Sequence, residues 1–240
     1  MDQKVKPEAT MTRQLRDGSI ALAGVEVRLP SLAGEVEILR GLDLHIETGE
    51  AVGVVGPSGS GKTTLLMVIA GLEATVGGTV NIAGQDLGQL DEDNLAVFRR
   101  DHVGIVFQGF HLIATMTAME NVAVPLELKG DDNAFVRART ELERVGLGHR
   151  LEHYPGQLSG GEQQRVAIAR ALAAGATIIL ADEPTGNLDH ETGVGIMDLL
   201  FELQREAGTT LVLVTHDREL AGRCSRIVEI SDGRVADRAT

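Results

Sequence analysis

Eight consecutive residues, 56–63, have the types and the spacing that bind the phosphates of a nucleotide. They read Gly-Pro-Ser-Gly-Ser-Gly-Lys-Thr, which fits the pattern G-x-x-x-x-G-K-[ST] at every required position. In such a loop the glycines let successive backbone N–H groups face an anion, the lysine reaches the β and γ phosphates, and the hydroxyl holds Mg²⁺. We therefore predict a metal contact at Thr63, a catalytic part for Lys62, and nucleotide binding by Gly56, Pro57, Ser58, Gly59, Ser60, Gly61, Lys62, Thr63 and Thr64.

A buried strand and a helix must flank this loop. Residues 51–55 form an apolar, β-branched run of the kind that fills a strand covered on both faces. Residues 62–72 read as a helix that Gly71 ends, and the positive end of its dipole faces the phosphates. A glycine-rich turn that fits the pattern by chance is the alternative, and the strand before and the helix after it disfavour that explanation.

Another predicted strand, 178–182, ends in a carboxylate at the place where phosphate-loop enzymes hold the acid that orders Mg²⁺, and a second carboxylate follows directly. We predict that Asp182 is a metal ligand and that Glu183 is the general base that polarises the attacking water. His216 follows the apolar strand 210–215, where an imidazole reaches a γ-phosphate. Taken singly, these are a common turn and a surface histidine; with the phosphate loop in the same chain, the catalytic interpretation is favoured.

A second helix N-terminus that suits an anion is predicted at 158–164, Leu-Ser-Gly-Gly-Glu-Gln-Gln. Ser159 stands at the N-cap and Glu162 three residues later, which is the spacing of a capping box. Gly160 and Gly161 leave the first backbone N–H groups uncovered. On spacing alone an ordinary capped helix is the better explanation, and the carboxylates that follow change that balance.

The segments before the phosphate loop and after it predict a small antiparallel sheet. Residues 20–28 and 42–47 alternate apolar and polar side chains, as half-exposed antiparallel strands do, and 79–82 is similar. Residues 227–235 read as a hairpin turned by Asp232 and Gly233.

The middle and the end of the chain predict a parallel core with a helical insert. The strand 103–107 delivers Gln108, and the helical segments 116–128 and 133–145 follow it. The strand 177–181, with 210–215 and an intervening helix, completes an α/β core whose ligands lie at the carboxyl ends of the strands. The predicted fold is a phosphate-loop NTPase with a RecA-like parallel core, an antiparallel β subdomain and a helical subdomain.

Composition narrows the class of protein. The 240 residues carry 35 acidic and 22 basic side chains, a formal charge of -13, which argues against nucleic acid as a partner. Cys224 is the only cysteine, so no intramolecular disulfide forms, as is typical of a reducing cytosol. No apolar run approaches the roughly 20 residues that span a bilayer. We expect a cytoplasmic protein without direct membrane insertion.

Together these motifs resemble the nucleotide-binding subunits of ABC transporters, from about residue 20 to residue 234. Gln108 corresponds to the Q-loop glutamine, 158–163 to the signature motif, Asp189 to the D-loop and His216 to the switch histidine, in the family's order. Phe107-Gln108 and the stretch 181–189 resemble the branch of lipoprotein-release, macrolide-export and cell-division ATPases, and within it the YbbA type. The resemblance implies an ABC ATPase domain at 19–240 with a helical insert at about 109–174, after a disordered tail at 1–18.

The resemblance also implies a head-to-tail homodimer around ATP and Mg²⁺. Ser159, Gly160, Gly161 and Glu162 of one subunit would cover the ATP held by the other, and Gln108 would join the metal site and the nucleotide. The dimer would drive an integral membrane permease with an extracytoplasmic domain, from the inner face of the membrane. Where the family usually has an aromatic that stacks on adenine, this chain has Leu29 and Pro30, so stacking is not predicted.

Other functions share part of these patterns, and the sequence disfavours all of them but one. An ABC-type ATPase that transports nothing and regulates cell-wall remodelling or division belongs to the same branch. DNA-repair or translation ATPases would need long inserts or a second ATPase unit, which the sequence lacks. A phosphate-loop kinase gives no reason for the segment 158–162.

Overall fold

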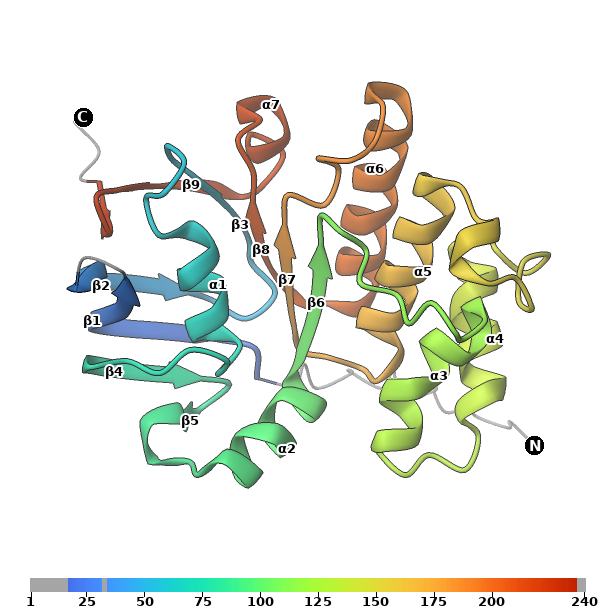
Figure 1. Ribbon diagram of the computed structural model, residues 1–240, viewed down its shortest axis with the longest axis horizontal. Helices are drawn as coiled ribbons and strands as arrows, with labels where there is room; N and C mark the ends of the chain where they lie inside the picture. The colour runs from blue at the N-terminus through green and yellow to red at the C-terminus, as the bar shows by residue number, and fades with distance from the viewer. Residues whose placement is uncertain (1–16, 32–33, 237–240) are drawn as a thin grey trace, which may run out of the picture.

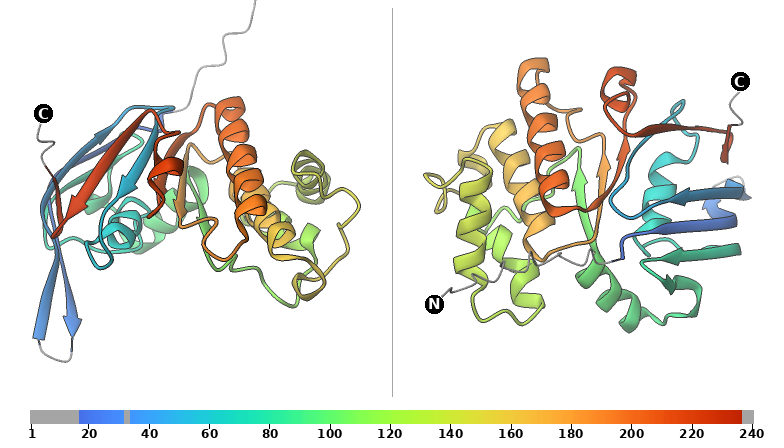
Figure 2. Two further views of the ribbon diagram at one scale, coloured as in Figure 1. Left: turned by 90° about the horizontal axis from the view of Figure 1, so that it is seen from above. Right: turned by 180° about the vertical axis from the view of Figure 1, so that it is seen from behind.

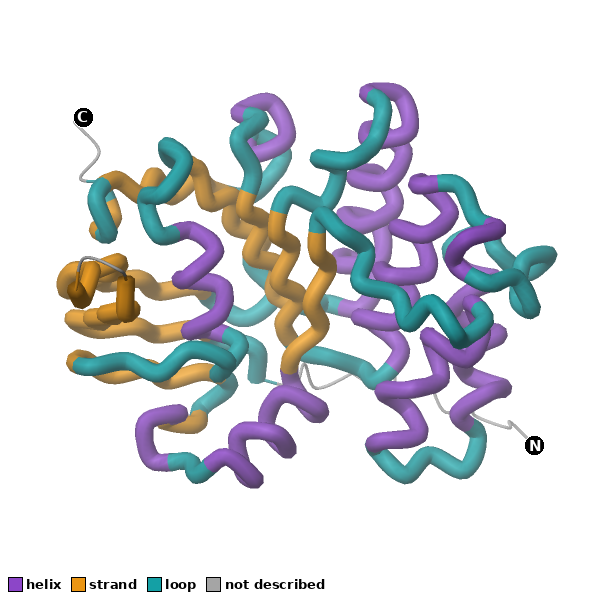
Figure 3. The backbone as a smooth tube through the Cα atoms, in the orientation of Figure 1, coloured by secondary structure: helices purple, strands orange, loops and turns teal. Residues whose placement is uncertain are grey.

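Two β-sheets of different kinds lie side by side and helices cover them (Figures 1 and 3). The protein is described from a computed structural model, which covers residues 17–31 and 34–236. The strands are β1 Ile20–Ser31, β2 Gly34–Ile46, β3 Ala51–Val55, β4 Gly77–Ile82, β5 Gln85–Asp86, β6 Val103–Phe107, β7 Ile178–Asp182, β8 Thr210–Val214, β9 Arg226–Ser231 and β10 Arg234–Val235. The helices are α1 Lys62–Ile69, η1 Leu87–Gln89, α2 Glu92–His102, α3 Ala118–Leu128, α4 Ala134–Arg144, η2 Pro155–Gln157, α5 Gly160–Ala173, α6 His190–Ala207 and α7 Arg218–Ala221.

A six-stranded sheet, in the order β10-β9-β3-β8-β7-β6, carries the phosphate loop. Strands β3, β6, β7, β8 and β9 pair in parallel, with Val54 opposite Val214 and Ala181 opposite Leu213. All residues of β3 and β8 are buried, as expected for strands covered on both faces. Because the strands run in one direction, their carboxyl ends meet at one edge of the sheet, and the predicted site residues follow those ends.

The antiparallel sheet, in the order β2-β1-β4-β5, shares a core with α1 and one face of the parallel sheet. Ile20 and Ile46 of the antiparallel sheet, Leu65 and Ile69 of α1, and Val52 of β3 are all fully buried in that core. The helix that follows the phosphate loop is therefore fixed from two sides. Beyond this core β1 and β2 continue as a two-stranded hairpin (Figure 2).

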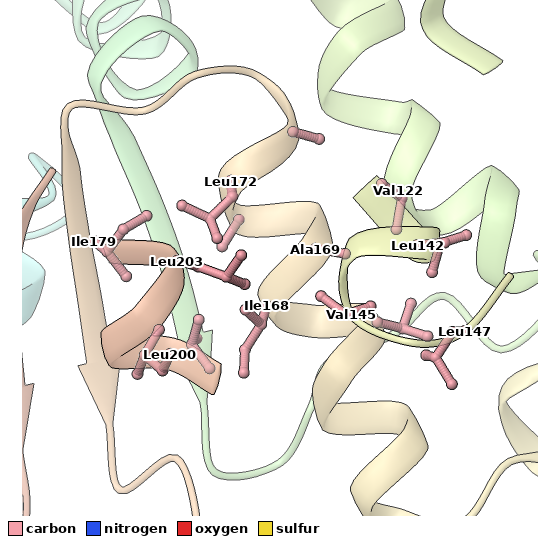
Figure 4. Packing of buried hydrophobic residues seen from close by; sticks show 14 of the residues in the cluster. Val122, Leu142, Val145, Leu147, Ile168, Ala169, Leu172, Ile179, Leu200 and Leu203 are labelled. Carbon is pink, nitrogen blue, oxygen red and sulfur yellow. The ribbon is translucent and has the colours of Figure 1, made fainter. Parts of the chain in front are cut away.

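A layer of helices, α3, α4 and α5, lies on the far side of β6 from α1 (Figures 1 and 2). Its core is continuous with the other face of the parallel sheet. Figure 4 shows Val122 of α3, Leu142 of α4 and Ile168 of α5 in one cluster with Ile179 of β7 and Leu200 of α6. Helix α5 is the central member, because it packs against α3, α4, α6 and β6.

The predicted fold class is confirmed, and several predicted bounds need correction. Strands β3 and β6 have the predicted bounds, and β7 has the bounds 178–182 predicted for it with the carboxylates rather than 177–181. The helix after the phosphate loop ends at Ile69, since the chain turns at Gly71 with a φ of +64°. Strands β1 and β2 are longer than expected, because they pair with each other along the hairpin. Helices α2 and α7 were not predicted.

The predicted tail, 1–18, lies outside the described residues except for Asp17 and Gly18. The predicted end of the tail at residue 18 needs correction, because Gly18 is buried and hydrogen-bonded to the folded domain. The Gly18 amide donates to Thr48 Oγ1 at 3.1 Å, and its carbonyl accepts from Thr210 Oγ1 at 2.7 Å. Within residues 17–31 and 34–236, no helix combines the length and the hydropathy needed to cross a bilayer.

Candidate nucleotide-binding and catalytic site

The loop between β3 and α1 has a backbone that only glycine permits at two positions. Gly56 has a φ of +153°, and a Cβ there would lie 2.1 Å from the carbonyl oxygen of Ile230. Gly61, the N-cap of α1, has a φ of +101°, and its Cβ would lie 2.8 Å from Leu39 Cδ2. No side chain caps the helix at Gly61. The first N–H groups of α1 are thus presented without a covering side chain, as an anion-binding N-terminus requires.

Lys62 lies across this loop. Its Nζ donates to the carbonyl oxygens of Gly56 at 2.9 Å and Pro57 at 2.8 Å. The ammonium is therefore already directed over the loop rather than into solvent. Ser60 is buried, and its Oγ has no hydrogen-bond partner among the described residues. A phosphate oxygen in the loop would give both groups a stronger, charge-assisted partner.

Thr63 and Asp182 meet at the carboxyl edge of the parallel sheet. Thr63 Oγ1 donates to Asp182 Oδ2 at 3.0 Å, although the residues are 119 positions apart in the chain. Burial, with a smaller contribution from the neighbouring charge of Glu183, raises the pKa of Asp182 despite the opposing effects of Thr63 and Lys62. A half-buried carboxylate beside a hydroxyl fits Mg²⁺, a hard cation that keeps waters and phosphate oxygens as its other ligands. Within the described residues, no group of three or more His, Cys, Asp or Glu side chains is placed to hold a metal ion by itself.

Glu183 and His216 form a pair. His216 Nδ1 lies 2.8 Å from Glu183 Oε2, with 22% of the glutamate side chain and 78% of the histidine side chain exposed. Glu183 has a φ of +47°, which is uncommon for a residue with a side chain. Its amide donates to the Val214 carbonyl at 3.0 Å, so the end of β8 fixes this backbone. The Glu183 carboxylate is held near Asp182, whose pKa its charge raises.

Gln108 is tied to the segment after Glu183. Its Nε2 donates to Asn187 Oδ1 at 3.1 Å, and Asn187 Nδ2 donates back to the Gln108 carbonyl at 3.0 Å. Gly186 makes room for this side chain, because a Cβ there would lie 2.6 Å from Gln108 Nε2. The amide nitrogen thus contacts Asn187, and the amide oxygen is the atom with which Gln108 would bind a metal.

The predicted capping box at the start of α5 is present. Ser159 N donates to Glu162 Oε2 at 2.8 Å, and Glu162 N donates to Ser159 Oγ at 3.3 Å. The backbone bond from Ser159 is the largest cause that lowers the pKa of Glu162, and Arg150 Nε, which donates to Oε1 at 2.9 Å, also favours the charged form. Gly160 and Gly161 pack closely, since added Cβ atoms would lie 3.1 Å from Leu188 and 2.6 Å from Thr192.

The structure brings some predicted residues together and leaves others apart. Lys62, Thr63, Asp182, Glu183 and His216 share one edge of the parallel sheet. The start of α5 does not join them, because α1 and α5 lie on opposite sides of β6 and β7 (Figures 1 and 2). One chain therefore presents two separate helix N-termini suited to anions, those of α1 and α5, and the predicted catalytic side chains lie near the start of α1.

Asp189 begins α6 beside the start of α5. Its carboxylate accepts from the Thr192 amide at 3.0 Å, and backbone bonding to Thr192 is the largest cause that lowers its pKa. A groove between this segment and His216 is lined by residues that include Glu183, Gly186 and Asp189.

Sequence reasoning missed the side chains that connect these segments. Asn187 was recognised only as part of a motif, and Gln164 and Arg170 of α5 were given no role. Gln164 is fully buried, which is unusual for an amide side chain in a helix. A polar residue at a buried helical position is the one signal that the sequence offers, and its partners are 20 and 57 residues away.

These features define the class of protein as a phosphate-loop nucleotide-binding ATPase of the α/β type. Known families and structures agree. The ABC transporter family matches residues 39–186. YbbA, described as an uncharacterized ABC transporter ATP-binding protein of Escherichia coli (strain K12), is 51% identical over 207 residues, which cover 85% of this chain and 91% of YbbA. The macrolide export ATP-binding/permease protein MacB of the same organism is 45% identical over 218 residues, 90% of this chain but 34% of MacB.

A solved structure of the ATP-binding cassette MJ0796, a dimer in a post-hydrolysis state bound to ADP and Pi, is 43% identical. It covers 91% of this chain and 97% of its own, with a TM-score of 0.83. A second dimeric MJ0796 structure is 44% identical, with the same TM-score. The chain belongs to the ABC transporter family and is one of its ATPases, and the resemblance to the branch that holds YbbA and MacB is confirmed.

Proposed function

We propose that the protein is the ATPase subunit of an ABC-type membrane complex, in which two copies close around Mg-ATP and drive a permease. The observation that carries this proposal is the separation of the two helix N-termini within one chain. Each copy supplies a loop with the catalytic side chains and, elsewhere, a second N-terminus without them. A head-to-tail pair would complete two enclosed sites, with equivalent surfaces exchanged about a twofold axis.

Within each site, the first copy would bind and activate the nucleotide. The loop N–H groups and Lys62 would bind the β and γ phosphates, while Thr63, Asp182 and the Gln108 amide oxygen would hold Mg²⁺. Bound Mg²⁺ neutralises charge on the β and γ phosphate oxygens. Glu183 would take a proton from water as its oxygen attacks the γ phosphorus, so that the bond to the β-phosphate oxygen breaks and ADP leaves. His216 would hold Glu183 and contact the γ phosphate.

The second copy would close the site through the start of α5. There Ser159, Gly160, Gly161 and the capping carboxylate of Glu162 would cover the γ phosphate of the nucleotide bound by its partner. The dimers of MJ0796, one of them bound to ADP and Pi, support this arrangement. Closure would be stabilised by ATP and lost after hydrolysis, since a ligand stabilises the state that binds it.

The closing and opening of the dimer would be transmitted to a permease through the loop that follows Gln108. Asn121 holds that loop rigidly: its amide nitrogen donates to the carbonyls of Ile113, Met116 and Thr117 at 3.1, 3.0 and 3.0 Å, and its oxygen accepts from the Ile113 amide at 2.7 Å. The Ile113 side chain is nevertheless 41% exposed. A docked permease would bury this apolar side chain on a loop whose backbone is already fixed.

The partner is proposed to be an integral membrane permease with an extracytoplasmic domain, which would place this chain on the inner face of the cell membrane. MacB supports the pairing, because its name joins an ATP-binding part, similar to this chain, to a permease. The work done would be export, extraction of a lipid or lipoprotein, or transmission of force across the membrane.

Two measurements on the purified, tagged protein test this proposal. ATP hydrolysis should require Mg²⁺ and disappear with EDTA, and detergent-solubilised membranes should yield a permease with a large extracytoplasmic domain. Replacing Ile113 by Asp should abolish capture of the permease and leave basal hydrolysis unchanged. Recovery of nucleic acid, or of no membrane protein at any nucleotide state, would contradict the proposed coupling.

A further inference from the structure

One buried amide joins the helix α5 to both loops of the catalytic site. The Gln164 side chain is fully buried, and its Nε2 donates to the carbonyl oxygens of Phe107 at 3.3 Å and Pro184 at 2.6 Å. Phe107 directly precedes Gln108, and Pro184 directly follows Glu183. A single NH₂ group therefore links the backbone of both neighbouring segments to the helix that begins at Ser159.

The orientation of this amide is determined by its partners. Two carbonyl oxygens accept hydrogen bonds, so the NH₂ group must face them and the Gln164 oxygen must face away. That oxygen is buried and has no partner among the described residues. Leaving a buried acceptor unpaired is unfavourable, whereas an apolar side chain at this position would pack without that cost. The nitrogen of the Gln164 amide thus makes two hydrogen bonds while its oxygen is left without one.

These bonds act on strained backbone. Glu183 has a φ of +47°, and its own amide is fixed by Val214 on one side. The Pro184 carbonyl, bonded to Gln164, fixes the other side. Since a small displacement of a catalytic group can lower a rate strongly, a second point of attachment bears directly on where the Glu183 carboxylate lies.

A second side chain of α5 supports the same connection. Arg170 donates to the carbonyls of Phe110 at 3.0 Å and His111 at 2.7 Å, two non-glycine residues with φ values of +58° and +47°. Gln164 holds the start of the loop after β6, and Arg170 holds its next turn. The loop that contains Gln108 is thus hydrogen-bonded to α5 on both sides of Gln108, and we expect it to move with that helix.

We infer that Gln164 is a positioning residue, which sets Glu183 and Gln108 relative to the helix whose N-terminus covers the partner's nucleotide. When that N-terminus docks on a phosphate, the same helix holds Glu183 in its catalytic position. This inference rests on the proposed role of Glu183 and adds a residue that contacts no nucleotide.

The chain provides a matched control for the test. Gln204 of α6 is also a buried glutamine, and its Nε2 donates to the carbonyls of Gly49 at 3.2 Å and Thr209 at 2.6 Å. These partners lie at the opposite ends of β3 and β8 from the site. Gln164→Met and Gln204→Met each remove two similar bonds and keep the side-chain volume, and Gln164→Met also removes an unpaired acceptor, so it should lower the Tm no more than Gln204→Met does.

Steady-state ATP hydrolysis then separates the two positions. For Gln164→Met we expect kcat to fall about 10- to 100-fold with the KM for ATP changed less than about twofold, because a positioning defect acts on the transition state. For Gln204→Met we expect both constants to stay within about twofold of the wild type. In a Glu183→Gln background, Gln164→Met should lower the residual rate no further, because both changes act through one group.

Equal kcat values for folded Gln164→Met and Gln204→Met would overturn the inference. If Gln164→Met does not fold, the same comparison is made with Gln164→Asn, which keeps an amide but is one methylene too short to reach both carbonyls. Failure of the proposed function itself is distinguishable, because Glu183→Gln would then retain wild-type turnover.

Discussion

Replacing Glu183 by Gln isolates the chemical step from binding. The carboxylate is four-fifths buried and lies 2.8 Å from His216 Nδ1. The amide has the same shape and keeps a hydrogen bond to the imidazole, so the fold and the nucleotide loop should be unchanged. It cannot accept a proton from water, and the loss of one negative charge beside the triphosphate should strengthen ATP binding rather than weaken it.

The expected loss of kcat in Glu183→Gln follows from the role of a general base. Positioned bases contribute about 10²- to 10⁴-fold, so kcat should fall by that factor, equivalent to about 2.7–5.4 kcal/mol in the activation barrier. The KM for ATP should stay the same or decrease. With Mg-ATP the variant should form a long-lived dimer, because binding closes the pair and hydrolysis no longer opens it.

The assay combines phosphate release at saturating Mg-ATP with light scattering after size-exclusion chromatography. Glu206→Gln is the control, since Glu206 carries only a surface ion pair with Arg144 at 2.9 Å and should change turnover little. A Glu183→Gln variant with kcat within about threefold of the wild type would remove Glu183 from the role of base.

Three further substitutions test other parts of the site. His216→Ala should lower kcat about 100-fold in phosphate-release assays and leave ATP binding, measured by calorimetry, within about threefold, because it removes the group that holds Glu183. Gly56→Ala should destabilise the fold by about 1–3 kcal/mol in urea unfolding and weaken ATP binding, since its Cβ would lie 2.1 Å from the Ile230 carbonyl. Asp182→Asn should raise the Tm at pH 7 while abolishing Mg²⁺-dependent turnover. Burial raises the pKa of Asp182, so the folded protein binds this proton more tightly, and the contribution of the group to stability falls as the pH rises through the folded pKa. The Tm advantage of Asp182→Asn should therefore shrink toward acidic pH, and a lower Tm than the wild type at pH 7 would contradict this explanation.

The sequence predicted the elements whose signals are local. Strands β3, β6 and β7 are short runs rich in apolar and β-branched residues, which are typical of strands in a parallel sheet, and the structure buries all of β3, most of β7 and alternate residues of β6. The start of α5 was predicted because a capping box is contained within four residues. The loop around Lys62 was predicted for the same reason. Each of these patterns needs no knowledge of distant partners.

The elements that depend on tertiary contacts were not predicted. Helix α2 is polar over most of its surface, and Phe98 is its one fully buried side chain, so the sequence offers few apolar residues from which a core-facing side of a helix could be recognised. Strands β1 and β2 extend into the hairpin because each pairs with the other, beyond the alternation that was visible in sequence. The contacts of Gln164 join residues from three segments, and sequence spacing alone cannot indicate them.

Mixed dimers test most directly whether each site is shared between two copies. Lys62→Ala disables the loop, and Gly160→Asp places a negative charge at the start of α5, where an added Cβ meets only the flexible end of Leu188 at 3.1 Å and the Phe110 ring at 3.7 Å. If sites form between copies, mixing the two single variants restores one intact site per mixed dimer, whereas pairing the double variant with wild type leaves none. We predict that the mixed single variants hydrolyse ATP, although each alone is inactive. The account would be contradicted if these mixed dimers stayed inactive while dimers of the double variant with wild type remained active.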